Sequence, residues 1–223
     1  MSARKAVIIG ATGLVGRQLV RLILKDDRYD SVVIITRSPF EIQDPKLVEV
    51  RIKNFDDLQK HSSKMNGHDF FCALGTTRQK AGSKAAFLRV DVEYPIAFAK
   101  IASQQKDFQQ FLAVTSIGAN SSSPLFYNKA KGQLEDELQK MKLKSLKIFQ
   151  PSLLIGDRNE FRFLEELAKV ISGIATFFVI GSKKRVGAIR DVEVAKAMVE
   201  TALKNQEGFE RIKPGKMIDI AYS

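Results

Sequence analysis

The sequence has one cysteine, two histidines, no tryptophan and no long apolar run. One cysteine, Cys72, excludes an intrachain disulfide and a cysteine-rich zinc site, and its apolar surroundings favour a small core residue over a reactive thiol. His61 and His68 alone do not favour a metal site. The longest apolar stretch, 170–180, is broken by polar residues and glycine, whereas a membrane-spanning helix needs roughly twenty apolar residues. The first apolar stretch is too short for a signal peptide. We therefore expect a cytoplasmic protein with no metal and no membrane contact.

The length and charge of the chain narrow the function classes further. Its 223 residues are enough for one α/β domain, and 44% apolar with 27% charged residues is typical of a soluble globular protein. Lysine and arginine number 36 against 25 acidic residues, so the formal charge is +11. The basic residues are spread along the chain without interleaved aromatic residues. We interpret them as a solvated surface that favours the approach of anionic ligands, and we expect no nucleic-acid partner.

Short β-rich runs alternate with amphipathic stretches along the chain. We expect strands at Ala6–Ile9, Ser31–Thr36, Val48–Ile52, Phe70–Leu74, Phe111–Thr115, Leu146–Phe149 and, more weakly, Met217–Ala221. Helical spacing marks Leu14–Lys25, Phe87–Gln104, Phe126–Met141, Phe161–Ile171 and Val192–Leu203. This alternation predicts an α/β fold, a doubly wound parallel sheet with helices on both faces. We expect one domain over residues 1–223, in which 151–223 contributes a small cap over the substrate.

A glycine-rich turn joins the first expected strand to the first expected helix. Its pattern is Gly-x-x-Gly-x-x-Gly, and the three glycines allow a tight turn, a close approach of backbone to pyrophosphate, and close packing of helix on strand. The helix N-terminus then presents N–H groups to the phosphates. The motif lies at a strand–helix junction, and this position favours a dinucleotide site over a plain glycine turn. The residues expected to bind the cofactor here are Gly10, Thr12, Gly13, Leu14, Val15 and Gly16.

The end of the second strand distinguishes NADP from NAD. NAD sites place an acidic residue there for the ribose 2′-hydroxyl, but this chain has Arg37 and no carboxylate before Glu41. A guanidinium pairs with a 2′-phosphate, with Ser38 assisting and Arg17 on the same side. We therefore predict NADP(H). After the third strand, Asp56 either accepts a hydrogen bond from the adenine amino group or caps the following helix.

A serine, a tyrosine and a lysine follow the fifth strand. Tyr127 and Lys131 stand four residues apart and share one helix face, and Ser116 ends the strand upstream. Tyrosine has a pKa near 10, and a neighbouring ammonium group lowers it. A lowering of about two units represents roughly 2.7 kcal/mol. In this hypothesis Tyr127 transfers the proton, Ser116 holds the substrate oxygen, and Lys131 also binds the nicotinamide ribose.

Together the glycine motif, Ser116, Tyr127 and Lys131 resemble the short-chain dehydrogenase/reductase superfamily, in its atypical or extended branch. Further stretches are similar to its Tat-interactive-protein-like oxidoreductases: Gly67–Asp69, Cys72–Gly82, Arg89–Asp91, Ser116–Ala119, Tyr127–Gly132 and Pro151–Arg158. The resemblance covers about residues 5–205, and the loop from Leu74 to Gly82 is its most specific part. It implies a Rossmann fold, NADPH in the glycine-rich cleft, and Ser, Tyr and Lys as catalytic residues.

The resemblance also implies further contacts and shows two departures. By position, Leu74, Gly75 and Thr76 lie beside the ribose and pyrophosphate, and Pro151, Ser152 and Leu153 border the nicotinamide. Asp91 stands where many members have a catalytic asparagine, and Gln150 where an arginine often precedes the proline. Arg78 and Lys80 follow the fourth strand, and they either bind an anionic group of the substrate or hold the loop.

Two functions fit these residues. The first is an NADPH-dependent oxidoreductase that transfers a hydride to or from a small carbonyl or alcohol substrate, with Tyr127 as acid or base. The alternative is an NADP(H)-binding regulator that senses redox state and acts through a protein partner with little turnover. The animal relatives are implicated in regulation through protein partners. The intact Ser116, Tyr127 and Lys131 favour the enzyme.

Overall fold

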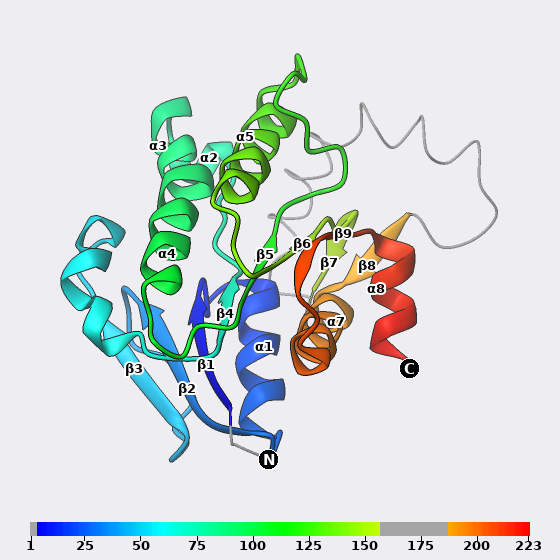
Figure 1. Ribbon diagram of the computed structural model, residues 1–223. Coiled ribbons are helices and arrows are strands. Elements are labelled where there is room, and N and C mark those ends of the chain that lie inside the picture. Colours follow the sequence, from blue (N-terminus) through cyan, green and yellow to red (C-terminus); the bar gives the residue numbers. More distant parts are fainter. Residues whose placement is uncertain (1–3, 157–186) are drawn as a thin grey trace.

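A seven-stranded parallel sheet forms the centre of the computed structural model, which describes residues 4–156 and 187–223. The strand order is β3-β2-β1-β4-β5-β6-β9 (Figure 1). The strands are β1 (Arg4–Ile9), β2 (Tyr29–Thr36), β3 (Leu47–Arg51), β4 (Asp69–Cys72), β5 (Gln110–Val114), β6 (Ser145–Phe149) and β9 (Gly208–Ile212). The chain winds outward from β1 in one direction and then from β4 in the other. The direction therefore reverses between β1 and β4, the place where such sheets bind ligands.

Helices cover both faces of the sheet (Figure 1). One face carries α1 (Leu14–Leu24), α7 (Asp191–Lys204) and α8 (Pro214–Ala221), and the other carries η1 (Phe55–Lys64), α4 (Tyr94–Ser103) and α5 (Phe126–Lys140). Three short elements lead into α4: α2 (Arg78–Ala81), α3 (Lys84–Leu88) and the π-helical turn η2 (Arg89–Glu93). A separate two-stranded sheet pairs β7 (Leu153–Ile155) with β8 (Ala188–Arg190). Among the described helices, none has the length and apolarity to cross a membrane.

The strands are apolar on both sides because each face packs against helices. Successive residues of a strand point to opposite faces. Val7 and Phe70 accordingly pack with Phe98 of α4, whereas Ile8 and Phe71 pack on the α1 side. All five are 0% exposed. Burial on both faces explains why strands such as β2 read as nearly unbroken apolar runs.

The predicted parallel sheet with helices on both faces is confirmed, but its last strand is not where the sequence suggested. Met217–Ala221 lies within α8, so the predicted strand there is wrong. Pro214 begins this helix, and buried Met217 and Ala221 stand one turn apart. The seventh strand is β9, which the pattern missed because it is an edge strand with exposed Phe209 and little apolar sequence. The expected helix Phe161–Ile171 lies outside the described residues.

The segment 151–223 contributes to the main layers as well as to any cap. β9 pairs in parallel with β6, and α7 and α8 pack on the sheet beside α1. The remaining part of the segment, 157–186, is outside the described residues. The division into one domain with a small cap therefore stays a prediction.

A buried carboxylate joins four strands at the amino end of the sheet. Asp69 of β4 is 0% exposed and accepts hydrogen bonds from Arg4 Nε at 2.7 Å and Arg4 Nη2 at 2.5 Å. It also accepts from the Tyr29 hydroxyl at 2.8 Å and from Gln110 Nε2 at 2.7 Å. Each donor comes from a different strand. The network therefore holds β1, β2 and β5 to β4.

Replacing this carboxylate should destabilise the fold. In Asp69→Ala the buried donors of Tyr29 and Gln110 and the charge of Arg4 lose their acceptor. We expect the free energy of unfolding to fall by about 3–5 kcal/mol, the usual cost of breaking a buried pair. Urea denaturation measures the change. Asp30→Ala, at an exposed position, should stay within about 0.5 kcal/mol of wild type. Equal effects of the two substitutions would contradict a structural role for Asp69.

Candidate functional site

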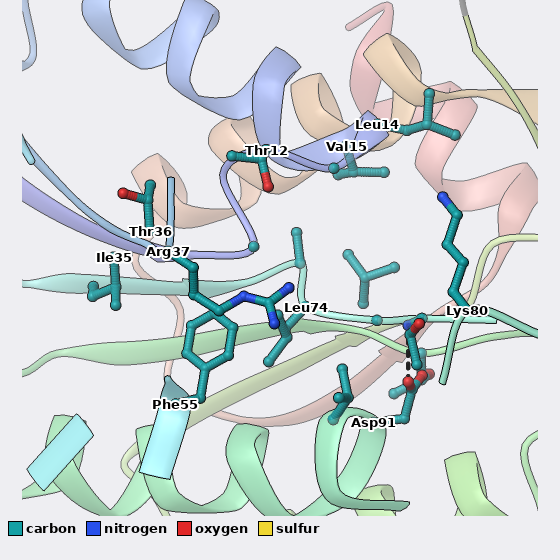
Figure 2. A pocket seen from close by; sticks show the side chains of 18 of the residues that line it. Thr12, Leu14, Val15, Ile35, Thr36, Arg37, Phe55, Leu74, Lys80 and Asp91 are labelled. Atoms are coloured by element: carbon teal, nitrogen blue, oxygen red, sulfur yellow. Dashed lines mark hydrogen bonds between the residues drawn. The ribbon is translucent and has the colours of Figure 1, made fainter. Parts of the chain in front are cut away.

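A cleft of about 660 Å³ opens at the carboxyl ends of β1, β2, β4 and β5. Figure 2 shows Thr12, Leu14 and Val15 along one wall, Arg37 and Phe55 toward one end, and Lys80 and Asp91 toward the other. Most of the residues predicted from the sequence line this cleft. They are Gly10, Thr12, Gly13, Leu14, Val15, Arg37, Leu74, Gly75, Thr76, Lys80, Tyr127 and Lys131.

The glycine turn is packed too tightly for other side chains. Gly10 has a φ of +83°, and a Cβ there would lie 2.5 Å from the carbonyl carbon and oxygen of Ala73. A Cβ on Gly16 would overlap the carbonyl oxygen of Gly10, so this residue packs helix on turn and does not line the cleft. These contacts bring the first turn of α1 directly over the end of β4.

The start of α1 fits a phosphate group. Gly13 is the N-cap residue; within the described ranges no side chain caps this helix, and its first turn carries no acidic residue. The first N–H groups of a helix have no partner within the helix and favour an anion. A cradle of backbone N–H groups beside glycines that exclude side chains is the chemistry a pyrophosphate requires.

Arg37 occupies the end of the cleft that the sequence suggested. Its guanidinium carbon lies 5.3 Å from the centre of the Phe55 ring (Figure 2), and Ser38 also lines the cleft. Arg17 donates from Nε to the Thr12 carbonyl oxygen at 3.0 Å. It lines a neighbouring hollow of about 150 Å³ that Thr12 and Ser38 also line. The two hollows adjoin at these residues, so Arg17 lies next to the end of the cleft that Arg37 lines.

Asp56 is held outside the cleft by other residues. Its carboxylate pairs with Arg89 at 3.3 Å and accepts from the Tyr94 hydroxyl at 3.1 Å. The suggestion that Asp56 caps the next helix is wrong, because Asn54 is the cap and its Oδ1 accepts from the Asp56 N–H at 2.8 Å. An adenine contact for Asp56 stays a prediction.

Lys131 is buried against a carboxylate. Its Nζ lies 2.6 Å from Asp91 Oδ1, and the two side chains are 5% and 1% exposed. The other carboxylate oxygen, Oδ2, accepts from the Thr76 N–H at 2.8 Å. Burial lowers the pKa of Lys131, but the charge of the Asp91 carboxylate is the largest opposing influence, and the net pKa is raised above its ordinary value. Lys131 is therefore charged at neutral pH, and Asp91 supplies its counter-charge.

Tyr127 departs from the expectation for its acidity. Burial is the largest influence and raises the pKa of Tyr127; Lys131 lowers it, Asp91 raises it, and the nearby Ser116 hydroxyl lowers it. The net pKa is raised, so the predicted lowering is wrong. The physical reason is first that Tyr127 is buried, and second that the ammonium group, whose Nζ lies 5.9 Å from the centre of the Tyr127 ring, is paired with Asp91.

Ser116 lies close behind this group. Its side chain is buried, and its Oγ makes no hydrogen bond that meets the usual geometry with any described residue. The hydroxyl is near enough to Tyr127 to affect that group's pKa, yet it does not line the cleft. An unsatisfied buried hydroxyl is costly unless a ligand or water completes it. A role at the substrate oxygen remains a prediction.

Several predicted residues do not line the cleft, and several residues that were not predicted do line it. Pro151, Ser152, Leu153 and Arg78 do not line the cleft, whereas Leu154 does. The other lining residues that sequence reasoning missed are Ile35, Thr36, Lys53, Phe55, Ala73, Val90, Val114 and Thr115. Six of these eight lie at or just beyond the carboxyl end of a strand. Strand ends in a predicted parallel sheet are therefore the signal that could have found them.

Gln150, which stands where the resemblance implies an arginine, binds a buried carboxylate. Its Nε2 donates to both carboxylate oxygens of Glu135, at 2.9 and 3.1 Å. Glu135 is 1% exposed and also accepts from Arg211 Nε at 2.8 Å and Thr115 Oγ1 at 2.6 Å. This network ties α5 to β5, β6 and β9. Gln150 therefore positions the helix that carries Tyr127 and Lys131.

Comparison with known proteins identifies the family. Residues 10–154 match a family described as NAD(P)H-binding. Protein HTATIP2 of Rattus norvegicus is 34% identical over 78% of this chain and 72% of its own length. The mitochondrial protein FMP52 of Meyerozyma guilliermondii is 32% identical over 98% of both chains. This chain belongs to the NAD(P)H-binding family. Membership confirms the resemblance seen in the sequence and assigns a nicotinamide dinucleotide to the protein.

Solved structures of the family's fold carry either cofactor. A short-chain dehydrogenase of Burkholderia cenocepacia in complex with NADP has a TM-score of 0.66 and 16% identity, over 97% of this chain and 90% of that one. MoeE5 in complex with UDP-glucuronic acid and NAD has a TM-score of 0.72 and 15% identity, over 94% and 76%. At such identities the likeness supports the fold alone. The names of the fungal relatives include the word mitochondrial, and the cytoplasm stays a prediction for this chain.

Cys72 should be chemically inert in the folded protein. Its side chain is buried in the core, and burial raises its pKa to about 12, so little thiolate is available to react. We expect no labelling by a thiol reagent at pH 8 in native buffer and one labelled thiol per chain in urea. Rapid labelling of the native protein would contradict this placement.

Proposed function

We propose that the protein is an NADP(H)-dependent oxidoreductase of the short-chain dehydrogenase/reductase type. It transfers a hydride between the cofactor and the carbon of a small carbonyl or alcohol substrate. The observation that carries the proposal is that Tyr127 and Lys131 line the same cleft as the glycine turn. A dinucleotide whose phosphates lie at the start of α1 runs along this cleft toward those two side chains. Family membership supports the cofactor class.

Each side chain has a distinct part in this proposal. The bound cofactor supplies or accepts the hydride. Lys131 binds the nicotinamide ribose, Tyr127 transfers a proton to or from the substrate oxygen, and Ser116 donates a hydrogen bond to that oxygen. Thr76 and its neighbours in the loop after β4 cover the pyrophosphate and ribose. Lys80 lines the cleft and Arg78 lies outside it, so an anionic substrate group is proposed to contact Lys80.

The charge of the cleft favours NADP over NAD. Four cationic side chains line it, and Asp91 is the single carboxylate among its described lining residues. That carboxylate is paired with Lys131, at the opposite end from Arg37. Within residues 4–156 and 187–223, no carboxylate that lines the cleft near Arg37 is available to bind a ribose 2′-hydroxyl. The guanidinium of Arg37, packed on Phe55, suits a 2′-phosphate.

Removing Arg37 tests the cofactor choice. A charged hydrogen bond contributes about 1.5–3 kcal/mol, so Arg37→Ala should weaken NADPH binding by roughly 10- to 100-fold while NADH binding changes little. Titration of cofactor fluorescence measures both affinities. Arg51→Ala removes an exposed arginine that pairs with Glu49 and does not line the cleft, and it should leave both affinities unchanged. Wild-type NADPH affinity in Arg37→Ala, or NADH binding at least as tight as NADPH, would exclude this preference.

Replacing the Tyr127 hydroxyl tests the reaction. Loss of a positioned proton donor costs about 10²- to 10⁴-fold in turnover, so Tyr127→Phe should lose turnover by that factor while still binding NADPH. Cofactor oxidation against a panel of aldehydes, ketones and quinones provides the measurement. If wild type turns over none of them, or if Tyr127→Phe is equally fast, the oxidoreductase proposal fails. The cofactor-sensing regulator with a protein partner is then favoured.

A further inference from the structure

Asp91 carries the negative charge that pairs with Lys131 in the cleft. We propose that Asp91 is a positioning residue that neutralises Lys131 and keeps Tyr127 protonated, so that Tyr127 meets a carbonyl substrate as an acid and needs alkaline pH to act as a base towards an alcohol. This inference rests on the proposed function, because it assigns the resting protonation state of the residue that transfers the proton.

The backbone directs Asp91 into the cleft. It lies in η2, a π-helical turn between α3 and α4, and such turns frequently occur at functional sites. One carboxylate oxygen lies 2.6 Å from Lys131 Nζ and the other accepts from the Thr76 N–H at 2.8 Å. Gly75 lies beside the pair, since a Cβ added there would be 3.5 Å from Asp91 Oδ1 and 3.8 Å from Lys131 Nζ. The carboxylate is therefore held by one partner on each of its two oxygens.

The charges around Tyr127 nearly cancel. From α5 it faces Lys131, from η2 Asp91, and from the end of β5 the neutral hydroxyl of Ser116. Cys72 on β4 lies near Lys131, and burial raises its pKa to about 12, which keeps it neutral. Lys80 lines the cleft from α2. A paired ammonium and carboxylate leave little net charge to stabilise a phenolate, and burial then favours the neutral phenol.

The protonation state sets how the rate of each direction of the step depends on pH. In reduction, the cofactor's hydride goes to the carbonyl carbon and the Tyr127 proton goes to the carbonyl oxygen. The phenolate left behind takes a proton from solvent. In oxidation, the phenolate must be present first to accept the hydroxyl proton. A phenol with a pKa of 10 is only about 0.1% ionised at pH 7, and a higher pKa reduces that fraction further. Reduction therefore uses the resting, protonated enzyme, whereas oxidation depends on an ionised fraction that grows with pH.

The chain allows Tyr127 to be observed directly. It has four tyrosines and no tryptophan, so ¹³Cζ-tyrosine labelling gives four signals, and Tyr127→Phe assigns one of them. We expect the wild-type Tyr127 signal to titrate above pH 10 in the cofactor-free protein. In Asp91→Asn the lysine loses its counter-charge, and the midpoint should fall by about one pH unit or more. A midpoint that is unchanged or higher would overturn the proposal.

A matched pair provides the control. Asp57 pairs with Lys60 at 2.6 Å, the same separation as Asp91 and Lys131, but on the surface and outside the cleft. Asp57→Asn removes the same charge and should leave the Tyr127 midpoint unchanged. An equal shift in both variants would show a general charge effect and would overturn the role of Asp91.

A second pair of variants tests the proposal if Asp91→Asn fails to fold. The double variant Asp91→Asn/Lys131→Met removes both buried charges, whereas Lys131→Met retains the carboxylate. The Tyr127 midpoint should be lower in the double variant than in Lys131→Met, because only the single variant keeps a negative charge beside the phenol. Equal midpoints would overturn the proposal.

The pH profiles of oxidation and reduction then test the protonation state of Tyr127 independently of the NMR titration. With a substrate from the carbonyl panel, wild-type kcat/KM for alcohol oxidation should rise about tenfold per pH unit from pH 7, while reduction stays level. Asp91→Asn should shift the rising limb of oxidation to lower pH. An oxidation rate that does not depend on pH in the wild type would overturn the protonated resting state of Tyr127. If the Tyr127 midpoint depends on Asp91 but no carbonyl is reduced, the proposed function fails while the charge assignment stands.

Discussion

Lys131 is an ammonium group buried among apolar and aromatic side chains, and such a charge costs several kcal/mol unless a carboxylate accompanies it. Asp91 provides that carboxylate at 2.6 Å, and the same carboxylate binds the backbone after β4 through Thr76. Three segments distant in sequence, α5, η2 and the loop after β4, therefore meet at one ion pair. The wall of the cleft that holds Tyr127 depends on this meeting.

The opposite wall depends on close backbone packing. The turn after β1 touches the end of β4 because Gly10 carries no side chain, and this contact brings the start of α1 over the cleft. Backbone N–H groups thus face one end of a bound dinucleotide's pyrophosphate, and Arg37 on Phe55 faces its adenosine part in the proposed arrangement. In the proposed function, one wall of the cleft holds the phosphates and the opposite wall transfers the proton, so that cofactor and acid meet in one cleft.

Local sequence predicted the parts of the molecule that local sequence determines. The β1 strand, the glycine turn and α1 follow one another within about twenty residues, and each needs only its own pattern to be recognised. The structure differs from the prediction where contacts with residues distant in sequence determine the local structure or the pKa. Met217–Ala221 is helical because it packs on α7, and the edge strand β9 is set by its pairing with β6. The acidity of Tyr127 was predicted from Lys131 alone, but burial and Asp91, on another element, reverse the shift. Three-dimensional contacts of this kind leave no signal in the spacing of residues.

The central claim is that one cleft holds the cofactor's phosphates at the glycine turn and its nicotinamide end at Tyr127 and Lys131. A crystal structure determined from crystals soaked in NADPH, or grown with it, tests this claim most directly. The account predicts pyrophosphate density at the N-terminus of α1, the 2′-phosphate beside Arg37, and the nicotinamide ribose within hydrogen-bond distance of Lys131. Density for the cofactor in another cavity, or a nicotinamide end turned away from Tyr127 and Lys131, would contradict it.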